Sequence, residues 1–202
     1  MRNLDKLSIG IFGGSFNPAH DGHMHVASCG LRELALDRIW WITSKQNPLK
    51  NKQTEYNKRV NSIKSLGLKK RMEINHIERK MNIQYSIQMI KALKVRSPNT
   101  KFIFLMGADN LSQFTEWKSW KEITLLVPIA VVARPGYGLK SQLSPTARFL
   151  SNHRVPEHKA HTLKYKSPPT WTFITPPLNK NSSSAIRKDI ANACLLYTSD
   201  AA

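Results

Sequence analysis

The chain has little cysteine, few acidic residues and no long apolar run, and each shortage excludes a class of protein. Its 202 residues include only Cys29 and Cys194, too few for a disulfide framework, so we expect thiols in a reducing compartment. The longest apolar run, residues 125–133, contains a proline and falls far short of the ~20 residues that a membrane span needs. The N-terminus leads directly into an apolar segment without the pattern of a signal peptide. We therefore expect a cytoplasmic protein with no membrane partner.

The shortage of acidic residues leaves a large positive charge. Against 31 Lys and Arg stand 13 Asp and Glu, giving a formal net charge of +18 and a pI of about 10.2. Such a charge fits nucleic acid, an acidic membrane or a polyanionic small substrate. The basic residues form no uninterrupted block, zinc-finger spacing or RNP signature, so we favour a phosphorylated small molecule and expect no nucleic-acid partner. A basic nucleic-acid-binding protein stays the alternative that charge alone supports.

Apolar runs alternate with helical patterns along the chain. Strands are predicted at residues 7–12, 38–43, 72–77, 101–106, 125–133 and 171–175, and helices at 21–34, 54–66 with Thr54 as N-cap, 85–95 and 146–152. Strand, helix and strand at this spacing imply a right-handed parallel crossover. We predict an α/β fold with a doubly wound parallel sheet of about six strands and helices on both faces. Without a linker or an internal repeat, one domain over residues 1–202 accounts for the length.

The most informative stretch is residues 9–25, which read IGIFGGSFNPAHDGHMH. An apolar run ends at Gly13 and Gly14, where two glycines allow a tight turn and the close approach of a ligand. A helix follows from Asp21, and the N–H groups and positive dipole at its start form an anion site. His20 and His23, three residues apart, direct both imidazoles to one side, where they can bind a metal or donate hydrogen bonds to phosphate. No Cys or Glu lies nearby at ligand spacing, which favours phosphate.

The string G-G-S-F-N-P-A-H-D-G-H resembles the H-x-G-H nucleotidyltransferase superfamily, whose members carry G-x-F-[DN]-P-x-H-x-G-H after the first strand. The string matches neither a Walker loop nor the Rossmann G-x-G-x-x-G fingerprint. The resemblance implies that His20 and His23 are catalytic. It also implies that the triphosphate of ATP is bound by Gly13, Gly14, Ser15, Phe16, His20 and His23.

A second small-residue turn follows the strand predicted at residues 101–106. Asp109, two residues after Gly107, suits hydrogen bonding to ribose hydroxyls, and capping of the next helix is an equal alternative. Phe114, Trp117 and Trp120 follow at a spacing of three, a helical stripe that more often belongs to a core than to a binding surface. The whole pattern, G-A-D-x-L-x-x-F-x-x-W-x-x-W, resembles bacterial nicotinate-nucleotide adenylyltransferases. The resemblance implies that Trp117 stacks on a pyridine ring and that Trp120 packs, with Gly107 and Asp109 binding ATP.

The same resemblance nominates residues at other strand and helix ends. A loop with Asn47 and Lys50 follows the second strand, and Arg134 opens an Arg-Pro-Gly turn. Tyr85 and Ser86 begin a helix where relatives carry Tyr-Thr, a pair that meets the pyridine carboxyl group. Lys50 is nominated as a phosphate contact, although an ordinary surface lysine is the general expectation. The implied pyridine-nucleotide-binding residues are Asn47, Lys50, Tyr85, Ser86, Trp117 and Arg134.

A serine-rich stretch near the C-terminus suggests a second phosphate site. Serines before an apolar periodic run are helix N-caps, and hydroxyls with free N–H groups at a helix start also cradle phosphate, with Arg187 one turn inside. The stretch resembles the family signature [IV]-S-S-[ST]-x-[IL]-R, except that Asn181 replaces the apolar residue. The resemblance adds Ser183, Ser184 and Arg187 to the ATP site, and Arg187 and Lys50 to the catalytic residues. Relatives continue differently beyond this helix, so we expect residues 195–202 to be atypical or non-native.

Over nearly the whole chain, the resemblance implies adenylyl transfer from ATP to nicotinate mononucleotide, giving nicotinate adenine dinucleotide and pyrophosphate in NAD biosynthesis. The acceptor phosphate attacks in line, so no protein nucleophile is required. We expect Mg²⁺ to arrive with ATP and predict no protein metal site, because the ion is usually held through phosphates and acidic residues are scarce. Nicotinamide mononucleotide or another phosphate acceptor is the alternative, and the sequence leaves a homo-oligomer open.

Overall fold

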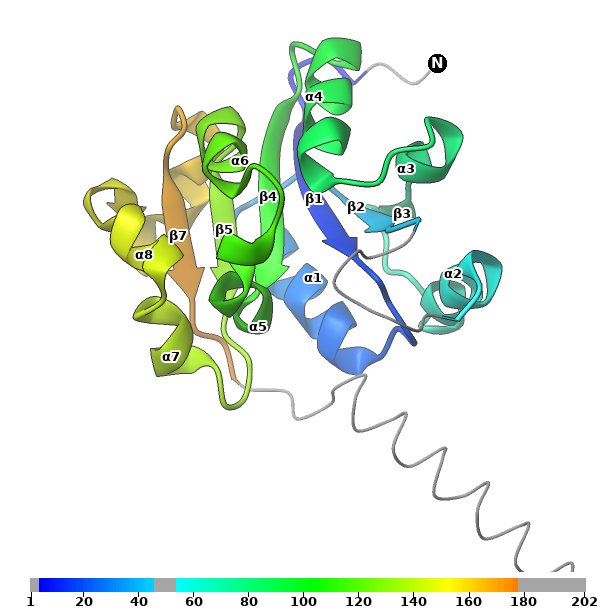
Figure 1. Cartoon of the computed structure of the whole chain (residues 1–202), viewed down its shortest axis with the longest axis horizontal. Helices are drawn as coiled ribbons and strands as arrows, with labels where there is room; N and C mark the ends of the chain where they lie inside the picture. Colours follow the sequence, from blue (N-terminus) through cyan, green and yellow to red (C-terminus); the bar gives the residue numbers. More distant parts are fainter. Residues whose placement is uncertain (1–3, 46–53, 178–202) are drawn as a thin grey trace, which may run out of the picture.

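The computed structural model describes residues 4–45 and 54–177, which form a parallel sheet with helices on both faces (Figure 1). The seven strands lie in the order β3-β2-β1-β4-β5-β7-β6, and every neighbouring pair is parallel. From β1 the chain moves outward to β3. From β4 it moves to β5 and the edge strand β6, and then returns to insert β7 between them. The order reverses between β1 and β4, which is where ligands bind in open parallel sheets. The predicted doubly wound α/β fold is confirmed.

The strands are short and apolar, as expected in a sheet covered on both faces. They are β1 Ser8–Gly14, β2 Arg38–Thr43, β3 Met72–Ile74, β4 Lys101–Gly107, β5 Ile129–Val132, β6 Arg154–Val155 and β7 Trp171–Ile174. The helices are α1 Asp21–Glu33, α2 Tyr56–Ser65, α3 Ile77–Lys80, α4 Ser86–Arg96, α5 Ala108–Ser112, α6 Trp120–Leu126, α7 Gly138–Gln142 and α8 Pro145–Phe149, with the 3₁₀ helices η1 Phe114–Glu116, η2 Ser151–His153 and η3 Glu157–Tyr165.

Alternate residues of each strand belong to two apolar cores, because successive side chains point to opposite faces. In β4, Phe102 and Phe104 join the core that α4, α5, α6 and α8 cover, whereas Ile103 and Leu105 join the core that α1, α2 and η3 cover. Figure 1 shows α4 and α6 on the near side of the sheet and α1 on the far side. Each large apolar side chain buried in this way contributes about 1.5–3 kcal/mol. The two cores together hold the strand ends in fixed register.

Some strand boundaries differ from the sequence prediction. The strand expected at residues 125–133 is shorter, because residues up to Leu126 complete α6 and Pro128, which has no N–H group, separates that helix from β5. Ile77, expected at the end of a strand, begins α3 instead, which leaves β3 with three residues. The sheet has seven strands rather than about six, since β6 has only two residues and is too short to give a periodic signal.

Two predicted helices also begin or end elsewhere. α2 begins at Tyr56, so Thr54 lies one position before the cap and is not the N-cap. The helix expected at residues 146–152 is α8, which starts at Pro145 and gives way to η2 after Phe149. Ser144 sets this start, because its side chain accepts a hydrogen bond from the Ala147 N–H at 3.3 Å and proline suits the first helical position.

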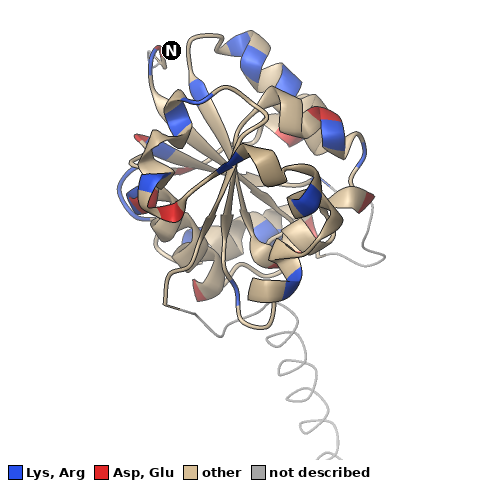
Figure 2. Cartoon of the chain, turned by 90° about the vertical axis from the view of Figure 1, so that its left-hand side faces the viewer, with Lys and Arg blue, Asp and Glu red and all other residues tan. Residues whose placement is uncertain are grey.

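No helix within residues 4–45 and 54–177 is long and apolar enough to cross a membrane. Figure 2 shows Lys and Arg on many elements, mixed with fewer Asp and Glu, rather than gathered on one element. The distribution agrees with the scattered pattern read from the sequence, so charge alone marks no single surface as the site.

Candidate active site

The candidate site is built at the carboxyl edge of the sheet, where β1 ends and the chain turns into α1. A Cβ atom on Gly14 would lie 3.1 Å from the ring of Phe16, so this glycine lets the ring fold back against the turn. Phe16 has a φ of 46°, which is uncommon for a bulky residue. Its ring is 1% exposed and packs against Trp41 and His23. The hydrophobic core therefore holds the turn in this conformation.

His20 and His23 form the first turn of α1 and fix each other's orientation. The Gly22 N–H donates to Nδ1 of His20 at 3.1 Å, and the His20 N–H donates to Nδ1 of His23 at 3.2 Å, a reciprocal cap of the helix. Because each ring accepts at Nδ1, its proton in the neutral form is on Nε2. The ring centroids are 3.9 Å apart. The helix start thus carries two Nε2–H donors side by side, while the N–H groups of Gly22, His23 and Met24 are bonded to His20.

Burial keeps the His20 imidazole neutral. The residue is 4% exposed, and desolvation lowers its pKa from 6.5 to about 4, helped by the positive charge of Arg134 and opposed by Asp21. A neutral ring in a desolvated position is a strong hydrogen-bond donor for developing negative charge. A bound polyphosphate would raise this pKa again, because a nearby anion favours the protonated ring.

A charged pair from the ends of β4 and β5 lies next to the histidines. Nε of Arg134 is 3.7 Å from Oδ1 of Asp109, and the same arginine is close enough to His20 to lower its pKa. A Cβ atom on Gly107 would lie 2.4 Å from Oδ1 of Asp109 and 2.7 Å from Cδ of Arg134, so the pair needs a glycine there. Gly107 itself is the N-cap of α5 and no side chain caps this helix. The capping alternative for Asp109 is therefore wrong, and its ribose role stays a prediction.

Tyr85 and Ser86 lie at the start of α4, where Tyr85 is the N-cap and Ser86 the first helical residue. The Nζ atom of Lys118 is 4.5 Å from the centroid of the Tyr85 ring, a cation–π distance. This contact joins the start of α4 to the segment between η1 and α6. Trp117, the neighbour of Lys118, consequently belongs to the same part of the molecule as Tyr85 and Ser86.

Phe104 links Trp117 to the glycine turn. The two rings meet edge to face with their centroids 6.0 Å apart, and a Cβ atom on Gly13 would lie 3.8 Å from the Phe104 ring. Trp120 packs against Phe149 and Phe114. The expected continuous helical stripe is wrong, because η1 ends before Trp117 and α6 begins at Trp120. Trp117 and Trp120 are both half-buried against the same core, so the ligand-facing role of Trp117 stays a prediction.

The structure places the predicted site residues in two neighbouring groups. Beside the glycine turn of Gly13 to Phe16 lie His20, His23, Gly107, Asp109 and Arg134. Beyond Phe104 lie Tyr85, Ser86 and Trp117. The remaining predicted residues, which are Asn47, Lys50, Ser183, Ser184 and Arg187, lie outside the described residues, as does the tail at 195–202, and their assignments stay predictions.

Sequence reasoning missed the side chains of α2 that support the glycine turn. Nη1 of Arg59 donates to the Ser15 carbonyl at 2.8 Å, and the Ala19 N–H donates to Oγ of Ser62 at 2.9 Å. Although charged, Arg59 is 2% exposed. The sequence did contain a signal, because Arg59 is four residues before Ile63 on the apolar face of the predicted helix.

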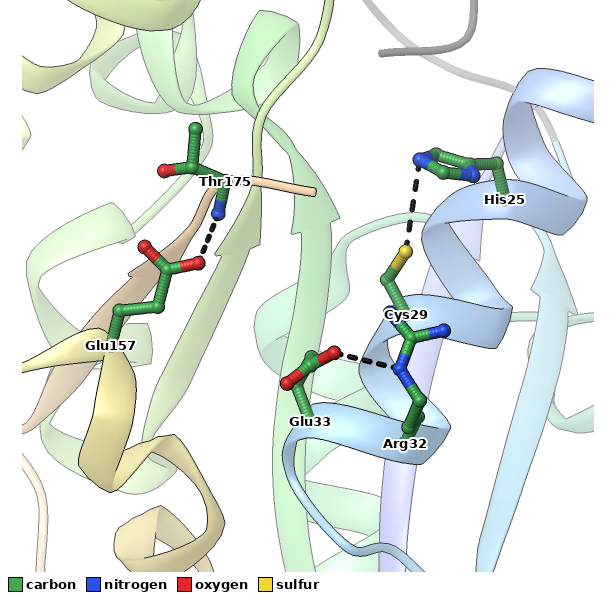
Figure 3. A network of polar contacts seen from close by, with 6 residues as sticks. All are labelled: His25, Cys29, Arg32, Glu33, Glu157 and Thr175. Carbon is green, nitrogen blue, oxygen red and sulfur yellow. Dashed lines mark hydrogen bonds and ion pairs between the residues drawn. The ribbon is translucent and has the colours of Figure 1, made fainter. Parts of the chain in front are cut away.

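Other polar contacts stabilise elements away from the site. Figure 3 shows His25 facing Cys29 along α1, with Nε2 3.7 Å from Sγ. Cys29 is a free thiol, and burial raises its pKa, which makes it unreactive. Figure 3 also shows the Glu157 carboxylate accepting the Thr175 N–H, at 2.6 Å, which fixes the end of β7.

The fold and the turn define a class of protein. A family model described as cytidylyltransferase-like matches residues 11–189, a range that includes the glycine turn, both histidines, Asp109 and Arg134. The protein is thus a nucleotidyltransferase of the cytidylyltransferase-like class, in which a parallel sheet carries an H-x-G-H turn after its first strand.

Individual relatives narrow this class. The chain is 38% identical over 183 residues to the probable nicotinate-nucleotide adenylyltransferase of Ruegeria sp. (strain TM1040), covering 90% of this chain and 97% of the relative. It is 40% identical over 184 residues to that of Parvibaculum lavamentivorans, covering 90% and 92%. The Plasmodium falciparum nicotinic acid mononucleotide adenylyltransferase, solved with APC and with NaAD, has the same fold, with a TM-score of 0.67 at 19% identity over 90% of this chain and 83% of that one. The chain belongs to the nicotinate-nucleotide adenylyltransferase family.

Proposed function

We propose that the protein transfers the adenylyl group of ATP to nicotinate mononucleotide, giving nicotinate adenine dinucleotide and pyrophosphate in NAD biosynthesis. The observation that carries the proposal is the convergence of His20, His23 and Arg134 on the glycine turn. The relatives that share this sequence over nine-tenths of the chain are named for that reaction, and the Plasmodium enzyme of the same fold was solved with NaAD. The free, buried thiol of Cys29 fits the reducing cytoplasm as the place of reaction.

The chemistry needs donors and positive charge rather than a protein nucleophile. A phosphate oxygen of the acceptor forms a bond to the α-phosphorus of ATP as the bond from that phosphorus to the bridging oxygen breaks, and pyrophosphate leaves. The Nε2–H groups of His20 and His23 stabilise the reacting and bridging oxygens, and Arg134 adds positive charge. Fixed donors of this kind need no reorganisation during the reaction, which is how positioning lowers the barrier.

The pyridine nucleotide is proposed to lie on the other side of Phe104. Trp117 offers a flat ring for stacking, and the backbone of Tyr85 and Ser86 at the start of α4 is proposed to meet the nicotinate carboxylate. The Tyr85 N–H already donates to Oε1 of Gln88 at 3.2 Å, so the Ser86 N–H is the proposed donor. Asp109 is proposed to accept ribose hydroxyls of ATP. By the family signature alone, Lys50 and Arg187 would neutralise the departing pyrophosphate, and Ser183 and Ser184 would bind the β- and γ-phosphates.

Mg²⁺ enters the proposal together with ATP. In the described parts of the chain, no group of three or more His, Cys, Asp and Glu side chains could hold a metal ion. The residues present therefore fit an ion that the triphosphate oxygens hold, rather than a protein cage. Bound in this way, the ion would neutralise phosphate charge beside the two histidines.

The proposal is tested by incubating the protein with ATP, Mg²⁺ and either nicotinate or nicotinamide mononucleotide, and measuring dinucleotide and pyrophosphate. We expect both products in equal amounts with the nicotinate acceptor and a lower kcat/KM with the amide. A preference for the amide would support the alternative acceptor. If neither acceptor gives a dinucleotide, the proposed function is wrong.

A further inference from the structure

One buried arginine joins the glycine turn to the two segments that lie between β2 and α2. Nη1 of Arg59 donates to the carbonyl of Ser15 at 2.8 Å, Nη2 to that of Lys45 at 3.0 Å, and Nε to that of Thr54 at 2.9 Å. Ser15 belongs to the glycine turn, Lys45 follows β2, and Thr54 precedes α2. A single guanidinium thus fixes the turn relative to the end of β2 and the start of α2.

Only arginine can make this arrangement. Its guanidinium is planar and directs five N–H donors along fixed, diverging directions, whereas a lysine ammonium is a compact charge on a flexible stem. Burial of the charge is costly and lowers the pKa of Arg59. The carbonyls offset part of this cost, as does the ring of Tyr56, whose centroid is 5.7 Å from the guanidinium carbon. The cost of burying the Arg59 guanidinium is explained if the protein needs the three carbonyls held in this geometry.

A buried carboxylate completes the arrangement from α3. Glu78 is 5% exposed, and its Oε2 accepts the Lys45 N–H at 3.2 Å. Both backbone groups of Lys45 are therefore held by buried, oppositely charged side chains. Burial raises the pKa of Glu78 to about 7, while the Lys45 N–H and the charge of Arg59 oppose this rise.

The rest of the turn is fastened to the same helix. Oγ of Ser62 accepts the Ala19 N–H, and Oδ1 of Asn17 accepts the Thr54 N–H at 3.3 Å just before α2 begins. Residues 15–19 thus contact α2 or its start at three points, and the strongest of these is the charged, buried contact of Arg59 with Ser15. A shift of this helix would carry the turn, and His20 behind it, out of place.

We propose that Arg59, together with Glu78, is a positioning residue for the transfer reaction, holding the turn of residues 15–20 where it meets the triphosphate without touching the substrate. The inference rests on the proposed function, since it takes this turn as the triphosphate site. An Arg59→Lys side chain keeps the charge and much of the volume but cannot hold three diverging carbonyls. A displacement of 1 Å at a reacting centre can cost on the order of 100-fold in rate.

The test compares Arg59→Lys with Arg71→Lys as a matched control. Nη1 of Arg71 donates to the Leu36 carbonyl at 3.3 Å just before β3, at the amino ends of the strands and away from the site. Arg71 is exposed and makes this one carbonyl contact, so the same substitution controls for replacing a guanidinium by an ammonium outside the site. We measure Tm, kcat, KM for each substrate, and the Kd of tripolyphosphate by calorimetry, all well below Tm. Arg59→Lys should lower kcat by about 10-fold or more and raise the Kd several-fold, whereas Arg71→Lys should change neither.

Each outcome decides the proposal. If Arg59→Lys lowers Tm but keeps the kcat and Kd of the unmodified protein, Arg59 is a structural residue only and the proposal is overturned. If Arg59→Lys does not fold, Glu78→Met is measured instead. The methionine side chain keeps the bulk of the glutamate but cannot accept a hydrogen bond from the Lys45 N–H. A several-fold loss of kcat in Glu78→Met supports the proposal, and an unchanged kcat overturns it.

The binding measurement separates this inference from the proposed function. If the unmodified protein binds tripolyphosphate but makes no dinucleotide, the proposed reaction is wrong. The positioning role of Arg59 is then still tested by the Kd of Arg59→Lys for tripolyphosphate. Weaker binding by this variant supports the positioning role, and equal binding overturns it. If the unmodified protein does not bind tripolyphosphate, the turn is not a polyphosphate site and both proposals are wrong.

Discussion

The phosphate side and the pyridine side of the proposed site use different kinds of chemical group. On the side of α1 and α2, the groups proposed to meet phosphate are the imidazoles of His20 and His23, fixed by hydrogen bonds and by the buried Arg59. On the side of α4 and α6, the pyridine ring is proposed to stack on the half-buried Trp117, next to the exposed Lys118, with the start of α4 meeting its carboxylate. Charge that develops during a reaction demands donors fixed in advance. A flat, neutral ring demands only area and orientation.

The difference also sets the sizes of the expected effects. Removing one fixed donor to a developing charge costs about 3–4 kcal/mol in the barrier. Stacking of an aromatic ring contributes on the order of 1 kcal/mol beyond burial. Substitutions on the phosphate side should therefore act mainly on kcat, and those on the pyridine side on the KM of one substrate.

The largest effect is expected at the histidines. His20→Ala and His23→Ala should each lower kcat by about 100-fold or more, because each removes an Nε2–H donor to the transferred phosphate. His20→Ala should also lower stability by about 1 kcal/mol through loss of the helix cap. Steady-state rates and thermal unfolding measure the two effects separately.

A matched variant separates catalysis from capping. His20→Asn keeps a good N-cap acceptor for the Gly22 N–H but shortens the reach of the donor. The Tm of His20→Asn should be close to that of the unmodified protein, while its kcat should stay as low as that of His20→Ala. Turnover near that of the unmodified protein in either alanine variant would remove the catalytic assignment, and the contrast between the two sides would lose its basis.

A smaller and more selective effect is expected at Trp117. Trp117→Ala should raise the KM for the pyridine nucleotide about 5-fold, the equivalent of 1 kcal/mol, and leave the KM for ATP nearly unchanged. Trp120→Ala is the control, because Trp120 packs on Phe149 and its loss should lower Tm without favouring one substrate. Equal changes in both KM values for Trp117→Ala would make it a core residue.

The sequence predicts features that depend on neighbouring residues better than contacts between distant segments. Short apolar runs and a two-glycine turn indicate a parallel sheet and the anion site at His20, because these signals depend on neighbours in sequence. The sequence could not show that Arg134 lies near His20 and pairs with Asp109, since their approach depends on strand order. Arg59 was missed for a related reason: its carbonyl partners lie in three separate segments, and a charged residue in a helix is usually solvated.

Two buried titratable groups on the phosphate side should make stability depend on pH in opposite directions. The folded-state pKa of His20 is about 4 against a usual 6.5, so the unfolded chain binds more protons between these values and stability is lost as the pH falls from 6.5 to 4. The folded-state pKa of Glu78 is about 7 against a usual 4.5, so the folded protein binds more protons in that window. Its contribution to stability is lost as the pH rises from 4.5 to 7.

Single variants separate the two opposing contributions. Glu78→Gln should gain stability relative to the unmodified protein as the pH rises from 4.5, levelling off above 7 at a few kcal/mol, since one pKa unit corresponds to about 1.4 kcal/mol. His20→Asn should gain relative stability as the pH falls below 6.5. Urea unfolding at pH 5, 6, 7 and 8 measures both, with Trp117→Ala as the control from the pyridine side, where the difference should not vary with pH. A pH-independent difference for Glu78→Gln would mean that the Arg59 charge and the Lys45 N–H fully offset the burial of this carboxylate, so that Glu78 would behave as a carboxylate in water.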